Sequence, residues 1–122
     1  MFKEDYVMKM IHELVKTVLK LMFHIDNVDD TIVLENEAAN ELYKKLMGLT
    51  KEYKINDAEN FLYENLDENN MEELKAALLF YEQLNYLSDD DLENADFSRE
   101  EIKDGIQVVL ERFGCEGIAG AF

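Results

Sequence analysis

Several residue types that interrupt helices or staple small folds are scarce in this chain of 122 residues. Proline and tryptophan do not occur at all. Average usage of roughly 5% would give about six prolines. Of the five glycines, only Gly48 and Gly105 lie before residue 114. Because glycine and proline are the poorest helix formers, their scarcity favours long uninterrupted helices.

The chain also lacks the sequence features of secreted and membrane proteins. It has one cysteine, Cys115, which excludes an intramolecular disulfide. The N-terminus shows no succession of charged, apolar and small-residue regions typical of a signal peptide. Apolar runs such as Leu21-Met22-Phe23 are far shorter than the ~20 residues that span a bilayer. We therefore expect a cytoplasmic protein without membrane contact.

Basic residues are few. Acidic residues outnumber them 28 to 12, which gives a net charge of −16. Such a surface repels nucleic-acid phosphates and anionic lipids, and no basic patch offsets it, so we expect no direct nucleic-acid binding. Hydrophobic residues nevertheless make up 48% of the chain, enough for an ordinary folded core. The length predicts a single domain.

What is present is helical periodicity. Apolar residues recur at spacings of three and four over residues 3–25, where Val7, Ile11, Leu14, Val18, Leu21 and Ile25 form a stripe. Asp26, Asp29 or Asp30 is suited to cap a second helix that ends at Met47, with Gly48 as its stop. Asn56 is suited to cap a short third helix that buries Phe61, Leu62 and Leu66. In the second helix we expect Val33, Ala39, Leu42, Tyr43, Leu46 and Met47 to point inward.

Two further helices complete the prediction. Residues 71–87 are apolar nearly all round, which predicts a central helix. Ser98 and Glu101 have the spacing of a capping box, with Phe97 and Ile102 as a hydrophobic staple. This start leads into a helix that Gly114 ends. We predict an all-α fold, an antiparallel bundle of about five helices in one domain over residues 1–113, followed by a flexible tail at 114–122.

Residues that could carry chemistry are few. Ser88 and Ser98 both stand where a helix cap is needed, and Cys115 has no neighbouring cation that would lower its pKa. His12 and His24 lie about 18 Å apart on one helix, so they cannot share a metal ion. Neither completes a Glu-x-x-His pair. We therefore assign no catalytic, cofactor-binding or metal-binding residue, and expect a protein that is not an enzyme.

The acidic segment 89–100 allows two interpretations. Asp89, Asp91, Glu93 and Glu100 match positions 1, 3, 5 and 12 of an EF-hand calcium loop. However, Asn94 stands where that loop needs glycine. The alternative is a capping box in which Ser88 and Asp91 start a short helical turn, and we prefer it.

The opening Met1-Phe2-Lys3-Glu4-Asp5-Tyr6, followed by Met10-Ile11, resembles an uncharacterised family of small acidic all-α bacterial proteins of unknown function. The resemblance continues through residues 42–49 and, more weakly, through residues 71–113. That last stretch resembles a tetratricopeptide-type helix pair, although the 34-residue period is not evident. The resemblance implies a helical fold and brings no activity and no functional residues.

These observations lead us to expect a non-enzymatic helical protein-interaction module. Its acidic surface suits a basic protein partner, and exposed parts of the first or fourth helix could make a homodimer. The alternative is an acidic mimic of duplex DNA that occupies a nucleic-acid-binding protein. A carboxylate-based enzyme or metal protein is a third hypothesis, which a buried cluster of Asp, Glu and His would favour.

Overall fold

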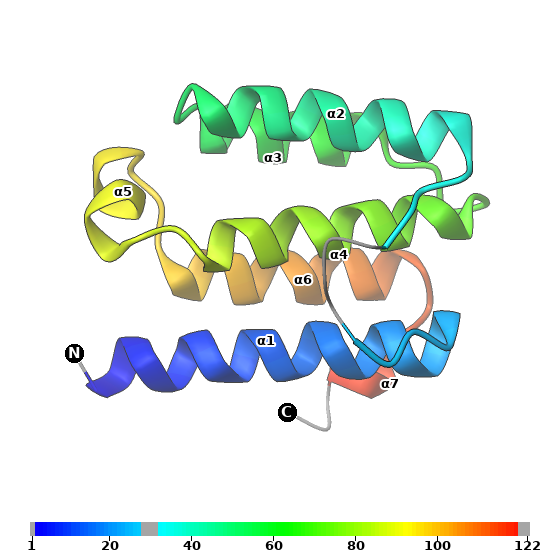
Figure 1. The fold of residues 1–122 in the computed structure, drawn as a ribbon, viewed down its shortest axis with the longest axis horizontal. Coiled ribbons are helices and arrows are strands. Elements are labelled where there is room, and N and C mark those ends of the chain that lie inside the picture. Colours follow the sequence, from blue (N-terminus) through cyan, green and yellow to red (C-terminus); the bar gives the residue numbers. More distant parts are fainter. Residues whose placement is uncertain (1, 28–31, 120–122) are drawn as a thin grey trace.

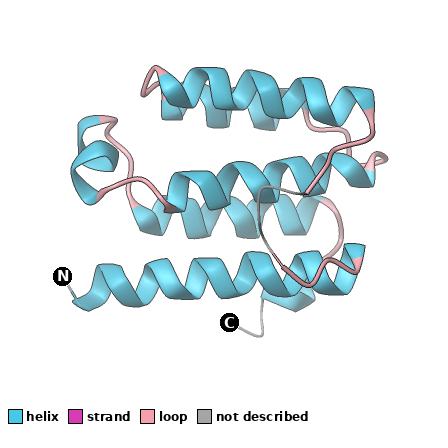
Figure 2. Ribbon diagram, in the orientation of Figure 1, coloured by secondary structure: helices cyan, strands magenta, loops and turns pink. Residues whose placement is uncertain are grey.

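The computed structural model describes residues 2–27 and 32–119. Regular secondary structure in these residues is entirely helical (Figure 2). The helices are α1 (Phe2–Phe23), α2 (Glu37–Lys51), α3 (Ile55–Asn65), α4 (Met71–Asn85), α5 (Asp89–Asn94), α6 (Arg99–Arg112) and α7 (Glu116–Ala119). The predicted all-α class is confirmed. The five predicted helices correspond to α1–α4 and α6, while α5 and α7 are additional short helices.

The helices form three layers, with successive long helices running in opposite directions (Figure 1). α2 and α3 make one outer layer, α4 and α6 the middle layer, and α1 with the short α7 the other outer layer. α4 packs against α1, α2 and α6, and α7 packs against α6. The middle layer therefore contacts helices on both sides, as in an antiparallel bundle.

α4 is the central helix, as its sequence predicts. Leu74, Leu78, Tyr81 and Leu84 on one side and Phe80 on the other are all fully buried. The prediction fails at the end of the helix, where Tyr86 lies 55% exposed. A helix that buries nearly its whole circumference offers almost no surface for self-association.

The core stripe of α1 is likewise confirmed for Val7, Ile11, Leu14 and Val18, which are buried. The stripe does not continue to Leu21, which is 58% exposed. α1 ends two residues earlier than predicted because the backbone turns at His24, which has a φ of 58°. Val33, expected to point inward, lies before α2 and is 64% exposed.

Two helix boundaries of α6 follow the predicted local chemistry. The Ser98 side chain caps the helix by accepting from the Glu101 amide, and Phe97 and Ile102 are buried as a hydrophobic staple requires. After α6, Gly114 has a φ of +74°, the left-handed conformation that ends helices.

Three other predicted ends are wrong. Asn36, not an aspartate of residues 26–30, caps α2, and α2 continues past Gly48 to Lys51. Lys54 holds the N-cap position of α3. Asn56 lies inside α3, and its side chain instead donates to the carbonyls of Ala95 and Asp96. Asn56 thus finds hydrogen-bond partners in a distant segment instead of capping α3, because tertiary contacts compete with caps.

The first part of the predicted tail contains the short helix α7. Cys115 is buried, and α7 packs against α6 directly after it. Residues 120–122 of the predicted tail lie outside the described residues. An apolar residue, Ile118, packs against the core and accounts for the docking of this short helix.

Candidate functional site

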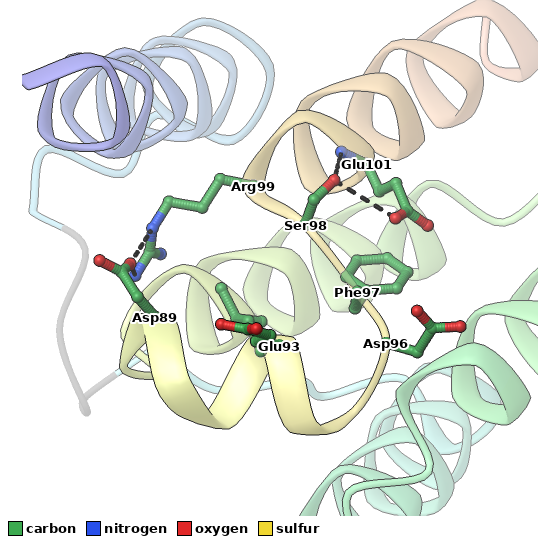
Figure 3. Close-up of a pocket in the computed structure, with 8 residues that line it drawn as sticks. Asp89, Glu93, Asp96, Phe97, Ser98, Arg99 and Glu101 are labelled. Carbon is green, nitrogen blue, oxygen red and sulfur yellow. Dashed lines mark hydrogen bonds and ion pairs between the residues drawn. The ribbon is translucent and has the colours of Figure 1, made fainter. Parts of the chain in front are cut away.

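The corner between α5 and α6 contains a cavity of about 390 Å³ (Figure 3). Asp89 and Glu93 reach it from α5, Asp96 from the link, and Glu101 from the first turn of α6. In Figure 3 Glu93, Asp96 and Glu101 lie around the ring of Phe97, and Asp89 lies beside Arg99. Phe97 and Leu92 form the apolar part of the wall. Four acidic groups around one concave surface make this corner the candidate site.

The fold of α5 decides between the two interpretations of segment 89–100. The Ser88 side chain accepts from the Asp91 amide, so the capping interpretation is confirmed. Asp89–Asn94 is a helix and Glu100 belongs to α6. The calcium-loop hypothesis is therefore wrong, because an EF-hand loop wraps its ligands around the ion in a non-helical turn.

The link from α5 to α6 fixes the position of the cavity wall. Asp96 has a φ of 55°, which turns the chain sharply after α5. The Phe97 amide then donates to the Leu92 carbonyl at 2.9 Å and holds the ring beneath the cavity. Ser98 Oγ bonds to Glu101 Oε1 at 3.3 Å as well as capping α6. The corner is thus preorganised by local hydrogen bonds.

Arg99 anchors this corner to the middle layer. Its guanidinium is 4% exposed and bonds to Asp89 Oδ1 and to the carbonyls of Asn85 and Leu87. Asn85 in turn donates to the Met8 carbonyl of α1 at 2.8 Å. A buried arginine needs such a complete set of acceptors, so the role of Arg99 at this corner is structural. The sequence gave no sign of this role, because two of the acceptors are backbone carbonyls and the others lie 10 and 14 residues away.

A second polar group lies between α1 and α4. His12 Nδ1 is 2.6 Å from Oε2 of Glu82, a residue that is fully buried. Burial raises the pKa of Glu82, and the interactions with His12 and Tyr86 lower it in part. A cavity of about 310 Å³ lies beside the pair and is lined by His12, Asn85, Tyr86 and Met8 with Asp5 and Lys9.

The sequence placed His12 correctly at the polar edge of α1, since its side chain is 37% exposed. Glu82 was not singled out from the sequence, although it is a single acid within an apolar run. An acid at such a position is a signal of a buried polar contact, because a carboxylate in a central helix requires a partner. His24 is exposed and outside this pair.

A third polar group joins α3 and α4. Glu59 Oε2 accepts from the hydroxyls of Tyr81 at 2.8 Å and Tyr63 at 3.0 Å. Burial raises the pKa of Glu59, the two hydroxyls lower it, and the nearby carboxylates of Glu101 and Asp104 raise it further. Burial also raises the pKa of Tyr63 to about 12. These hydroxyls stay protonated at neutral pH, so the cluster is a hydrogen-bonded part of the core.

The hydroxyl and thiol groups considered as nucleophiles, those of Ser88, Ser98 and Cys115, have roles in the fold. Both serines are N-caps, of α5 and α6. Burial raises the pKa of the Cys115 thiol, and the Glu116 carboxylate acts in the same direction. A thiol with a raised pKa is a poor nucleophile at neutral pH. Among the described residues, no group of three or more His, Cys, Asp and Glu side chains has the arrangement of a metal site.

Comparison with known proteins places the chain in a family. Residues 1–114 match a family of unknown function, DUF6483. The chain belongs to DUF6483. No curated protein and no solved structure matches it significantly. Because the DUF6483 match covers α1 to α6, the corner and both polar groups lie within the family region. Within the described ranges, no helix is long and apolar enough to cross a membrane.

Proposed function

We propose that this DUF6483 protein is a non-enzymatic helical protein-interaction module that binds a basic segment of a partner at the α5–α6 corner. The main support for this proposal is the excess of negative charge in that cavity. Four carboxylates line it, and its one cation, Arg99, is committed to Asp89 and to backbone carbonyls. In the ion pairs of the described residues, Glu93, Asp96 and Glu101 have no cationic partner.

The cavity suits a lysine or arginine side chain. Its carboxylates attract the charged head group, and the apolar wall of Leu92 and Phe97 accommodates the aliphatic stem. Opposed charge also steers the encounter, so binding is expected to weaken steeply with salt. A similar contact by a second copy of the chain would account for self-association. α1 is the better candidate for that contact, because α4 is nearly all buried.

The test is titration calorimetry with a short arginine-rich peptide at low and at physiological salt. We expect the triple variant Glu93→Gln, Asp96→Asn, Glu101→Gln to bind at least about tenfold more weakly, roughly 1.4 kcal/mol. The matched control neutralises three acids at the start of α2, Glu35→Gln, Glu37→Gln and Glu41→Gln. The two variants lose equal charge, so equal weakening in both would mean that only the overall field attracts the peptide, and would refute a specific corner site.

The alternative, a DNA mimic, has a separate signature. The exposed acids Glu100, Asp104 and Glu111 follow one line along α6, as phosphates follow a strand. A mimic would compete with duplex DNA for a DNA-binding protein, and the competition would depend on these α6 acids. Peptide binding that depends on the corner residues and not on the α6 acids would favour the interaction module.

A further inference from the structure

The outer face of α1 carries a row of lysines. Lys9, Lys16 and Lys20 are exposed and, at 100° per residue, fall within about 40° of one another around the helix. Several other cations of the described residues are paired locally, as Lys44 is with Glu41, Lys75 with Glu72 and Arg112 with Glu68. None of the ion pairs within the described residues involves the three α1 lysines. We call them the lysine row.

The outer face of α6 carries a row of the opposite charge. Glu100, Asp104 and Glu111 are exposed and also fall within about 40° of one another. None of the described ion pairs engages these three acids either. We call them the acid row.

The spacings of the two rows are complementary. Lys9, Lys16 and Lys20 are separated by seven and then four residues, about 10.5 Å and 6 Å along the helix. Glu100, Asp104 and Glu111 are separated by four and then seven residues. When the two helices lie antiparallel, Lys20 faces Glu100, Lys16 faces Asp104 and Lys9 faces Glu111, all in one register.

The fourth member of each face agrees with the antiparallel direction. Glu13 lies within the lysine row, and Gln107 lies within the acid row, both half-buried. In the antiparallel register Glu13 faces the neutral Gln107. In the parallel register that pairs Lys9 with Glu100 and Lys20 with Glu111, Glu13 would face Asp104, and two like charges would oppose each other. The sequence of charges therefore selects one direction.

We infer that the lysine row of α1 docks on the acid row of α6 in a second copy of this chain, with the two helices antiparallel. This inference rests on the self-associating part of the proposed function and names its surface. Exposed apolar side chains, Tyr6 on α1 and Val108 on α6, lie about 40° around the helix from the nearest charged residue of each row and add apolar contact. α1 and α6 run in the same direction in Figure 1, so a two-fold axis perpendicular to them would bring α1 of each copy antiparallel to α6 of the other.

Salt dependence gives the first test, by sedimentation velocity at high protein concentration. Copies of net charge −16 repel over a Debye length of about 30 Å at ~0.01 M salt, and close ion pairs are screened at ~1 M, where that length is about 3 Å. We therefore expect the strongest self-association near ~0.15 M. A monomer at all three salt concentrations overturns the inference.

Charge reversal gives the second test. The variant Lys9→Glu, Lys16→Glu, Lys20→Glu and the variant Glu100→Lys, Asp104→Lys, Glu111→Lys should each self-associate at least about tenfold more weakly than the parent. A mixture of the two should form a complex, because each row then meets its opposite. The variant with all six changes keeps the net charge of −16 and should self-associate again. Regained association at unchanged net charge would show that the pairing of the two rows, and not the overall charge, drives self-association.

The control reverses three lysines of α2 and its C-terminal end, Lys44→Glu, Lys51→Glu and Lys54→Glu, and should self-associate no more weakly than net charge alone requires. Circular dichroism establishes that each variant is folded. Failure of the six-residue variant to regain association overturns the inference. So does binding of the lysine row to vesicles of anionic phospholipid with no self-association, which would assign it a different occupant. Peptide binding at the α5–α6 corner is unaffected by either result, so the proposed function is judged separately.

Discussion

At the residue scale, Glu82 is the least expected feature of the core. Its carboxylate is fully buried, Oε2 contacts His12, and Oε1 has no hydrogen-bond partner in the part of the chain that the structure describes. Removing a charge from water without full compensation is costly. The raised pKa of Glu82 expresses that cost, since burial disfavours the ionised form.

This pKa predicts a pH dependence of stability. A carboxyl group whose pKa is higher in the folded than in the unfolded state stabilises the fold fully below its unfolded pKa, and the contribution is lost as pH rises through the folded pKa. We expect the stability of Glu82→Gln relative to the parent to rise between pH 5 and pH 8 by on the order of 1 kcal/mol. Urea unfolding followed by circular dichroism measures it, with the exposed Glu37→Gln as control.

The sign of the difference is what matters for Glu82. If the difference in stability between Glu82→Gln and the parent stays constant over this pH range, the pKa of Glu82 is the same in the folded and unfolded states. Burial of the carboxyl group would then cause no pH-dependent loss of stability. A difference that falls as pH rises would contradict the prediction outright, because it would require a lowered pKa in the folded state.

At the element scale, two glycines in helices have opposite environments. A β-carbon on Gly105 of α6 would overlap the hydroxyl of Tyr81 and lie 2.6 Å from Oε2 of Glu59, whereas one on Gly48 of α2 would meet nothing within 4 Å. Gly105 thus lets α6 approach the hydrogen-bonded cluster of α3 and α4. Gly48 has no comparable contact and carries only the entropic cost of glycine in a helix.

These environments predict opposite effects of one substitution. Gly105→Ala should destabilise the protein by about 1–3 kcal/mol through overpacking. Gly48→Ala should stabilise it by roughly 0.5–1 kcal/mol, since alanine is the better helix former. Thermal unfolding of both variants beside the parent measures the pair. A stabilised Gly105→Ala variant would mean that Tyr81 and Glu59 move aside at no cost.

The same two glycines show how far sequence patterns reach. Periodicity predicted the long helices, because apolar spacing reports which faces are buried. The Ser98 capping box was also predictable, since its partners are three residues apart. Gly48 was misinterpreted as a stop, because a glycine within a helix and a glycine after one look alike until the neighbouring helices are placed.

The site was less predictable than the fold. Of the four acids of the corner, only Asp89 and Glu93 belong to the group that the calcium-loop spacing singled out, because the cavity that brings in Asp96 and Glu101 depends on the turn at Asp96. The partners of Arg99 and Glu82 lie far away in sequence: His12 is 70 residues from Glu82, and Asn85 is 14 residues from Arg99. Contacts of that kind follow from the packing of layers, which no local spacing encodes.

At the scale of the whole molecule, the net charge of −16 acts against the compact state. Most acids are exposed, and the ion pairs that they form with lysine or arginine in the described residues are few and partly solvated. Such pairs contribute only ~0–1 kcal/mol each. The balance between repulsion and the apolar core should therefore depend on ionic strength.

We predict that raising NaCl from ~0.01 to ~0.5 M stabilises the protein by on the order of 1 kcal/mol, about 4 °C in melting temperature, because salt screens like charges. Measurements at low protein concentration keep self-association out of the result. Choline chloride should act like NaCl, since ionic strength alone is responsible. A melting temperature that stays constant or falls with salt would show that repulsion does not limit stability.

The burial of Cys115 has a practical consequence. It is the one sulfhydryl of the chain, it is 9% exposed, and it lies between α6 and α7. A thiol reagent can therefore label the native protein at a single position, and only when the C-terminal end opens. The labelling rate of the unmodified protein would report how often α7 detaches, and it would do so without an engineered probe.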